Sequence, residues 1–151
     1  QVYGALWAAT GIDQDYPDYE PAAIDLEADD AFHDLKPPVL RAEDLALDVL
    51  RAGHQIAGDI PILIVNEPML ISTGRNSDIR YNFFYPRWAY DQYRVIMAGQ
   101  AQRQGWRYLD LWDLVPMSEF TNSAVHLTPA GSRLLADAIA AAILSVPPGR
   151  R

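Results

Sequence analysis

The chain has 151 residues, of which half are hydrophobic and 21% are charged, and this composition predicts one globular domain with a substantial core. The formal net charge is −8, and the acidic residues concentrate between Asp13 and Asp48. This charge argues against a nucleic-acid partner, because a phosphate backbone requires a basic surface. There are no cysteines, which excludes a disulfide framework, a thiolate metal site and a cysteine nucleophile. No apolar run is long enough to span a bilayer.

Residues 1–38 are predicted to form an N-terminal helix followed by an acidic irregular segment. Residues 1–10 are apolar and precede Gly11, a suitable left-handed residue for a helix end, with a buried strand as the alternative. From Ile12 to Pro38, prolines, tyrosines and acids follow one another without periodicity, so we expect a long surface excursion. A loop of that length is unusual unless it is functional or packs on something absent from this chain.

Residues 39–146 alternate between helical and strand patterns, and residues 147–151 are predicted to be a tail. Apolar residues at helical spacing from Ala42 to Ile56 predict a helix that ends at Gly58. The largely β-branched run 62–65 lies between two prolines and predicts a parallel strand covered on both faces.

A second helix is predicted from about Arg87 to Gln104, ending at Gly105, and a second strand over 108–112. The last helix has the clearest start, because Thr128 is a good N-cap and Pro129 suits the first helical position. Its predicted buried stripe contains apolar residues at helical spacing: Leu135, Ala138, Ile139, Ala142 and Ile143.

This alternation predicts an α/β fold with a parallel sheet and right-handed crossovers. Two strands cannot cover three helices, so we expect the sheet to continue with strands from sequence upstream of Gln1 or from a partner chain. The chain is therefore expected to be an incomplete domain.

The loop after the second strand is the main candidate site, because ligands of open α/β sheets bind beyond the carboxyl ends of the strands. It carries Asn122, Ser123 and His126 directly before the last helix. A histidine there can act as a general base near neutral pH. Taken alone, one loop histidine is more often a surface or capping residue.

The segment FTNSAVHLTPAGSRLLADAI resembles the last signature block of the SGNH/GDSL hydrolases. In that block, Asp-x-x-His precedes a hydrophobic residue, a small polar stretch, a glycine and an apolar helix, and His126, Leu127 and Gly131 fit it. The resemblance covers roughly residues 40–145. It implies a flavodoxin-like three-layer αβα sandwich and the hydrolysis or transfer of acyl groups, often acetyl esters on carbohydrates. It also implies that His126 activates a serine nucleophile, and it slightly favours an extracytoplasmic location.

The sequence departs from that family's pattern at the groups that should act with His126. The chain contains no Gly-Asp-Ser motif, so the nucleophilic serine is expected in sequence before Gln1. Ser123 stands where the family has an aspartate, and Asn122 stands one residue earlier. Asp110 or Asp113 is an alternative source of the missing carboxylate. The rival interpretation is a non-catalytic SGNH-like module that binds a carbohydrate or a protein partner.

Substrate-binding residues are predicted at two further places. Asn66 and Glu67 directly follow the first strand, where either substrate binding or a simple turn role is possible. Asn76 and Arg80 lie in the aromatic loop 69–86, where they could hydrogen-bond a sugar while aromatic faces stack on it. No His, Asp or Glu residues have metal-ligand spacing and no glycine-rich phosphate loop follows a strand, so neither a metal nor a cofactor is expected.

Overall fold

The structure is a computed structural model that describes residues 24–145. The helix expected over residues 1–10 and the tail 147–151 lie outside this range. The described chain forms, in order, α2 (Leu47–Ala57), β1 (Leu63–Asn66), α3 (Arg87–Gln104), β2 (Arg107–Asp110) and α4 (Pro129–Leu144). Two short 3-10 helices, Ala42–Asp44 and Met117–Glu119, lie in the connections.

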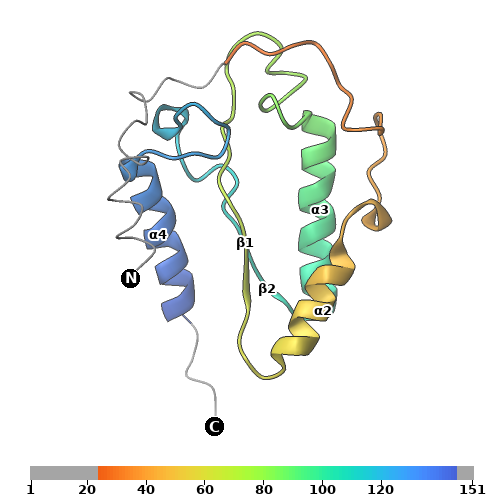
Figure 1. The fold of residues 1–151 in the computed structure, drawn as a ribbon, viewed down its shortest axis with the longest axis vertical. Helices are drawn as coiled ribbons and strands as arrows, with labels where there is room; N and C mark the ends of the chain where they lie inside the picture. The colour runs from red at the N-terminus through yellow and green to blue at the C-terminus, as the bar shows by residue number, and fades with distance from the viewer. Residues whose placement is uncertain (1–23, 146–151) are drawn as a thin grey trace, which may run out of the picture.

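The two strands form a parallel pair, with Leu63 opposite Arg107 and Asn66 opposite Asp110. Figure 1 shows α4 on one side of this pair and α3 with α2 on the other side. The predicted α/β character with a parallel sheet is therefore confirmed in its general form. Among the described residues the sheet has two strands.

The second and third predicted helices begin and end where local signals place them. α3 ends at Gly105, which has a left-handed φ of 68° and donates its backbone N–H to the carbonyl oxygen of Ala101. α4 begins after Thr128, whose hydroxyl accepts the backbone N–H of Gly131 at 3.1 Å. Both predictions are confirmed.

The predicted start of the first helix was wrong, because α2 begins at Leu47 rather than near Ala42. The Asp44 carboxylate accepts the backbone N–H of Arg41 at 2.8 Å and closes a 3-10 turn. Leu45 is then extended, with φ −109° and ψ 143°, so the turn cannot continue as an α-helix. The apolar face also differs from expectation, since Val49 and Ile56 are 65% and 88% exposed.

Buried hydrophobic residues lie on α3 and in the loops that follow the two strands, and two clusters form beyond the carboxyl ends of the strands. One cluster joins the loop after β1 to the loop after β2: Leu70, Val115, Phe120 and Ala124. A second cluster joins the loop after β1 to α3: Met69, Tyr81 and Tyr90. Leu63, Ile64 and Val65 of β1 are only half-buried. The two loops are thus packed firmly at the edge of the sheet where a site was predicted.

Residues 24–38 form the irregular excursion that the sequence predicts, and they lie along the loop that follows β1. The carbonyl of Leu26 accepts Nδ2 of Asn76 at 2.7 Å, and the carbonyl of Asp29 accepts Nη1 of Arg80 at 2.6 Å. Nε1 of Trp88 donates to the carbonyl of Asp30 at 2.6 Å. The excursion therefore packs on this chain itself. No helix between residues 24 and 145 is long and apolar enough to cross a membrane.

Candidate functional site

A network of hydrogen-bonded side chains joins the ends of the two strands. Asn66 ends β1 and Asp110 ends β2, and Nδ2 of Asn66 donates to Oδ1 of Asp110 at 2.8 Å. The other carboxylate oxygen of Asp110 accepts Nε of Arg94, from α3, at 2.9 Å. The Arg94 guanidinium also lies 4.1 Å from the centre of the Trp112 ring. Asp110 is thus held between the partner strand and α3.

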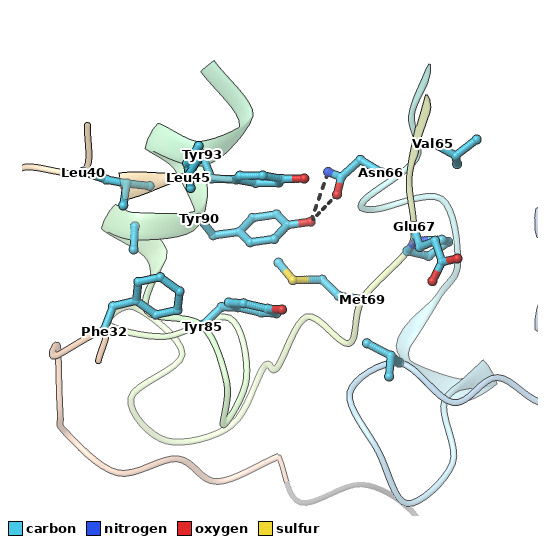
Figure 2. Close-up of a pocket in the computed structure, with 13 residues that line it drawn as sticks. Phe32, Leu40, Leu45, Val65, Asn66, Glu67, Met69, Tyr85, Tyr90 and Tyr93 are labelled. Atoms are coloured by element: carbon cyan, nitrogen blue, oxygen red, sulfur yellow. Dashed lines mark hydrogen bonds between the residues drawn. The ribbon is translucent and has the colours of Figure 1, made fainter. Parts of the chain in front are cut away.

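Tyr90, in the first turn of α3, adds its hydroxyl to these hydrogen-bonded side chains. Its oxygen lies 3.1 Å from Nδ2 and 3.3 Å from Oδ1 of Asn66. Figure 2 marks both contacts with dashed lines. Burial raises the pKa of Tyr90 well above its usual value, so the hydroxyl stays neutral across the physiological range. The amide of Asn66 is therefore held in one position by two neighbours.

A pocket of about 470 Å³ opens between these hydrogen-bonded side chains and the segment that contains Phe32 and Leu40. Its walls come from five parts of the molecule. They are the excursion with Phe32, the segment before α2 with Leu40 and Leu45, the end of β1 and the loop after it, α3 with Tyr90, and the loop that carries His126 with Val125. A concave, largely apolar pocket with a few polar groups at the carboxyl edge of a parallel sheet is a typical ligand site.

One wall of the pocket is a continuous row of aromatic rings. The ring centroids of Phe32 and Tyr85 are 6.1 Å apart, those of Tyr85 and Tyr90 are 5.2 Å apart, and those of Tyr90 and Tyr93 are 5.6 Å apart. In Figure 2 the three tyrosine hydroxyls all point toward the strand side of the pocket. We call these four residues the aromatic row.

The loop between β2 and α4 presents His126 on a firmly held backbone. Phe120 and Leu127 form an antiparallel bridge, and the carbonyl of His126 accepts the backbone N–H of Thr121 at 2.9 Å. The carbonyl of Ala124 accepts the backbone N–H of Leu70 at 2.8 Å, which ties this loop to the loop after β1. The side chain of His126 is exposed, so a reacting group can reach it.

The two residues predicted to assist His126 form other contacts. The hydroxyl of Ser123 accepts the backbone N–H of Val125 at 3.4 Å, and Oδ1 of Asn122 lies 3.4 Å from the Thr121 hydroxyl. Among residues 24–145 neither side chain hydrogen-bonds the imidazole. Of the two alternative sources of a carboxylate, Asp110 already holds Asn66 and Arg94, and Asp113 is exposed.

The four predicted substrate-binding residues fall into two groups. Asn66 and Glu67 line the pocket, and Asn76 and Arg80 instead anchor the excursion. Arg80 is 8% exposed, and its guanidinium donates to the carbonyls of Asp29, Asn82 and Phe83. A direct role of Asn76 or Arg80 in binding substrate stays a prediction. Their hydrogen bonds reach backbone carbonyls of the excursion.

Sequence reasoning missed the pocket-lining role of Tyr90 and Tyr93. Their spacing on α3 fits a buried helix face as well as a pocket wall, so the pattern carried no signal that separates the two. Phe32 was also missed, because its place depends on contacts with residues about fifty positions further along the chain. In the described part of the chain, no group of three or more His, Asp or Glu residues could hold a metal ion.

Comparisons with protein-family models, with curated proteins and with solved structures found no match for this chain.

Proposed function

We propose that this chain is part of an SGNH-like ester hydrolase or O-acyltransferase domain of the flavodoxin-like three-layer type, with His126 as its general base. The observation that carries the proposal is the place of His126. It is exposed on a loop at the carboxyl edge of the parallel pair, directly before the capped start of α4. Its neighbour Val125 lines the pocket at the end of β1, so the loop that carries His126 borders a place where a substrate could bind.

The proposed reaction is a two-step acyl transfer. A ring nitrogen of His126 takes the proton from a serine hydroxyl, and the serine oxygen attacks the acyl carbonyl. The imidazolium then returns the proton to the departing alcohol, leaving the acyl group on the serine. Water or an acceptor hydroxyl releases the acyl group in the second step. The serine, like the remaining strands of the sheet, would come from sequence outside this chain or from a partner chain.

Asn66 and Glu67 are the proposed substrate-binding residues of this chain. The Glu67 side chain is exposed at the pocket and can accept hydrogen bonds from substrate hydroxyls. Asn66 is 8% exposed and bonded to Asp110 and Tyr90, so it shapes the floor of the pocket. Asn122 and Ser123 are proposed to orient His126 once substrate is bound, because apo hydrogen bonds at catalytic sites are often loose.

The test is turnover of p-nitrophenyl acetate by the full-length protein. His126→Ala is expected to lower kcat/KM by about 100-fold or more, the usual contribution of a positioned general base. His33→Asn is the matched control, because His33 is an exposed histidine with φ 54°, a conformation that asparagine tolerates. Full activity in His126→Ala would overturn the proposal.

A second candidate function is a non-catalytic SGNH-like module that binds its ligand in the pocket. The observation that favours it is the absence, among residues 24–145, of a carboxylate bonded to the His126 imidazole. Without such a group, imidazolium is less well stabilised during acyl transfer. A full-length protein that binds a ligand but turns over no ester would support this candidate against the first.

A further inference from the structure

The parallel pair has two outer edges, and neither has a partner strand among residues 24–145. The backbone carbonyl of Asn66 faces β2, since it accepts the N–H of Leu111 at 3.0 Å. Alternate residues of a strand direct their backbone groups to opposite edges, so the N–H and C=O groups of Leu63 and Val65 face away from β2. Backbone groups shielded from water are almost always paired. This outer edge of β1 is therefore able to bind a further strand.

The two helices on one face of the pair indicate which edge is extended. α2 and α3 lie on the same face (Figure 1), and the His54 ring of α2 stacks on the ring of Trp106, just after α3, at a centroid distance of 5.1 Å. Crossovers between parallel strands are right-handed, so the step from β1 through α3 to β2 has one direction across the sheet. A strand joined to β1 through α2, on the same face, lies one step back in that direction. It therefore lies beside β1, on the side away from β2.

α2 has an apolar face that is exposed in the structure. Val49 and Ile56 are 65% and 88% exposed, and Ala52 and Gly53 between them are exposed as well. Spacings of three and four residues place these residues on one side of the helix. A helix that connects two parallel strands packs its apolar residues on the sheet that the strands form. A strand beside β1 would extend the sheet beneath α2 and give this face a surface to pack on.

Residues 2–9 have the composition of such a strand. The run VYGALWAA contains no charged side chain and is nearly continuously apolar, which is typical of a parallel strand covered on both faces. It also precedes α2 in the sequence, as the crossover requires. A strand parallel to β1 ends at the carboxyl edge of the sheet, and the excursion lies at that edge, where Phe32 lines the pocket at the end of β1. Residues 11–23 can extend over about 40 Å, far more than the spacing of about 5 Å between neighbouring strands.

We propose that residues 2–9 bind along the outer edge of β1 as a parallel strand, with α2 as the right-handed crossover that joins the two. The order across the sheet is then residues 2–9, β1 and β2. The strands expected from outside this chain would pair beyond residues 2–9. The proposal concerns the assembly of the sheet, so it goes beyond acyl transfer and does not depend on His126.

The chain has no cysteine, so introduced pairs of cysteines report directly which edge residues 2–9 occupy. Ile64 of β1 and Tyr108 of β2 lie opposite each other in the register and serve as matched positions. A strand beside β1 lies about 5 Å from β1 and about 10 Å from β2, and only the shorter distance allows a disulfide. In the full-length protein, Ile64→Cys or Tyr108→Cys is combined with one of four changes in the segment: Ala5→Cys, Leu6→Cys, Trp7→Cys or Ala8→Cys.

The four changes cover both faces of the strand, so at least one is expected to form a disulfide within the chain with Ile64→Cys in most of the molecules. None is expected to do so with Tyr108→Cys. Peptide mass spectrometry after mild oxidation measures both, and four positions keep the test valid even if one variant folds poorly. Disulfides with Tyr108→Cys, or with neither position, would overturn the proposal. Disulfides between two molecules would also overturn it and would assign the edge to a second copy of the chain.

Discussion

Asp110 is held by hydrogen bonds from the two elements beside it, β1 and α3. Its carboxylate holds Asn66 of the partner strand on one oxygen and Arg94 of α3 on the other. The Asp110 and Arg94 side chains are 26% and 29% exposed, so the pair is better shielded from solvent than an ordinary surface ion pair. The floor of the pocket depends on this arrangement.

Arg94→Leu is therefore expected to lower the free energy of unfolding by about 1–2 kcal/mol, because it leaves a partly buried carboxylate with one fewer donor. Arg41→Leu is the control, since Arg41 pairs with Glu43 and Asp44 at a site where its side chain is 60% exposed. That control is expected to cost less than about 0.5 kcal/mol. Urea unfolding measures both, and equal losses would contradict this reading of Asp110.

At the scale of single residues, the sequence was informative where position along a strand decides the role. Asn66 and Glu67 were expected at the site because residues that follow a parallel strand lie at its carboxyl edge. Asn76 and Arg80 were harder to predict. Their hydrogen bonds go to Leu26 and Asp29, about fifty residues earlier in the chain, and no local pattern reports such contacts.

At the scale of elements, local signals placed α3 and α4 correctly and misplaced the start of α2. Gly105 and the pair Thr128–Pro129 are end signals whose effect depends on neighbours within one turn. The start of α2 was decided by a competing turn, in which the Asp44 carboxylate binds the Arg41 backbone N–H. Short polar side chains regularly offer the backbone such alternatives to a helix.

The α4 cap gives a prediction at this scale. The Thr128 hydroxyl accepts the backbone N–H of Gly131 at 3.1 Å and donates to the Glu119 carboxylate. Thr128→Ala is expected to lower the free energy of unfolding by about 1 kcal/mol, and Thr128→Ser is expected to keep most of it. Thermal unfolding followed by circular dichroism measures the difference. Equal stability of the alanine and serine variants would show that the cap contributes nothing.

At the scale of the whole molecule, the sequence predicted the α/β alternation and the parallel pair but not the distribution of burial. Val49, Ile56 and Ile143 were expected on buried faces and are 65%, 88% and 55% exposed. Helical periodicity shows that a face is apolar, but what covers that face is decided by elements elsewhere. The two buried clusters instead join the loops beyond the strand ends to each other and to α3.

The buried tyrosines make the stability of the whole molecule sensitive to alkali. Burial raises the pKa of Tyr81, Tyr90, Tyr93 and Tyr108 above the ordinary tyrosine value of 10.0. The folded chain therefore holds these protons more tightly than the unfolded chain does. Their stabilising effect is fully present below about pH 10 and is lost as the pH rises beyond it.

The free energy of unfolding is accordingly expected to fall steadily above about pH 10, with tyrosinate absorbance rising as the chain unfolds. Tyr108→Phe is expected to reduce this slope and to cost little at neutral pH, because its buried hydroxyl has no hydrogen-bond partner among residues 24–145. Urea titrations at several alkaline pH values measure the slope. An unchanged slope in Tyr108→Phe would contradict the argument from burial.

We propose that His126 acts as the general base of an acyl-transfer site. The most direct test of this role adds a carboxylate beside His126 and measures whether only His126 can use it. In the full-length protein, Ser123→Asp is expected to raise kcat/KM for p-nitrophenyl acetate by about tenfold or more, since a carboxylate stabilises imidazolium. The same change combined with His126→Ala is expected to give no increase. An equal gain in both backgrounds, or a gain in neither, would contradict the claim.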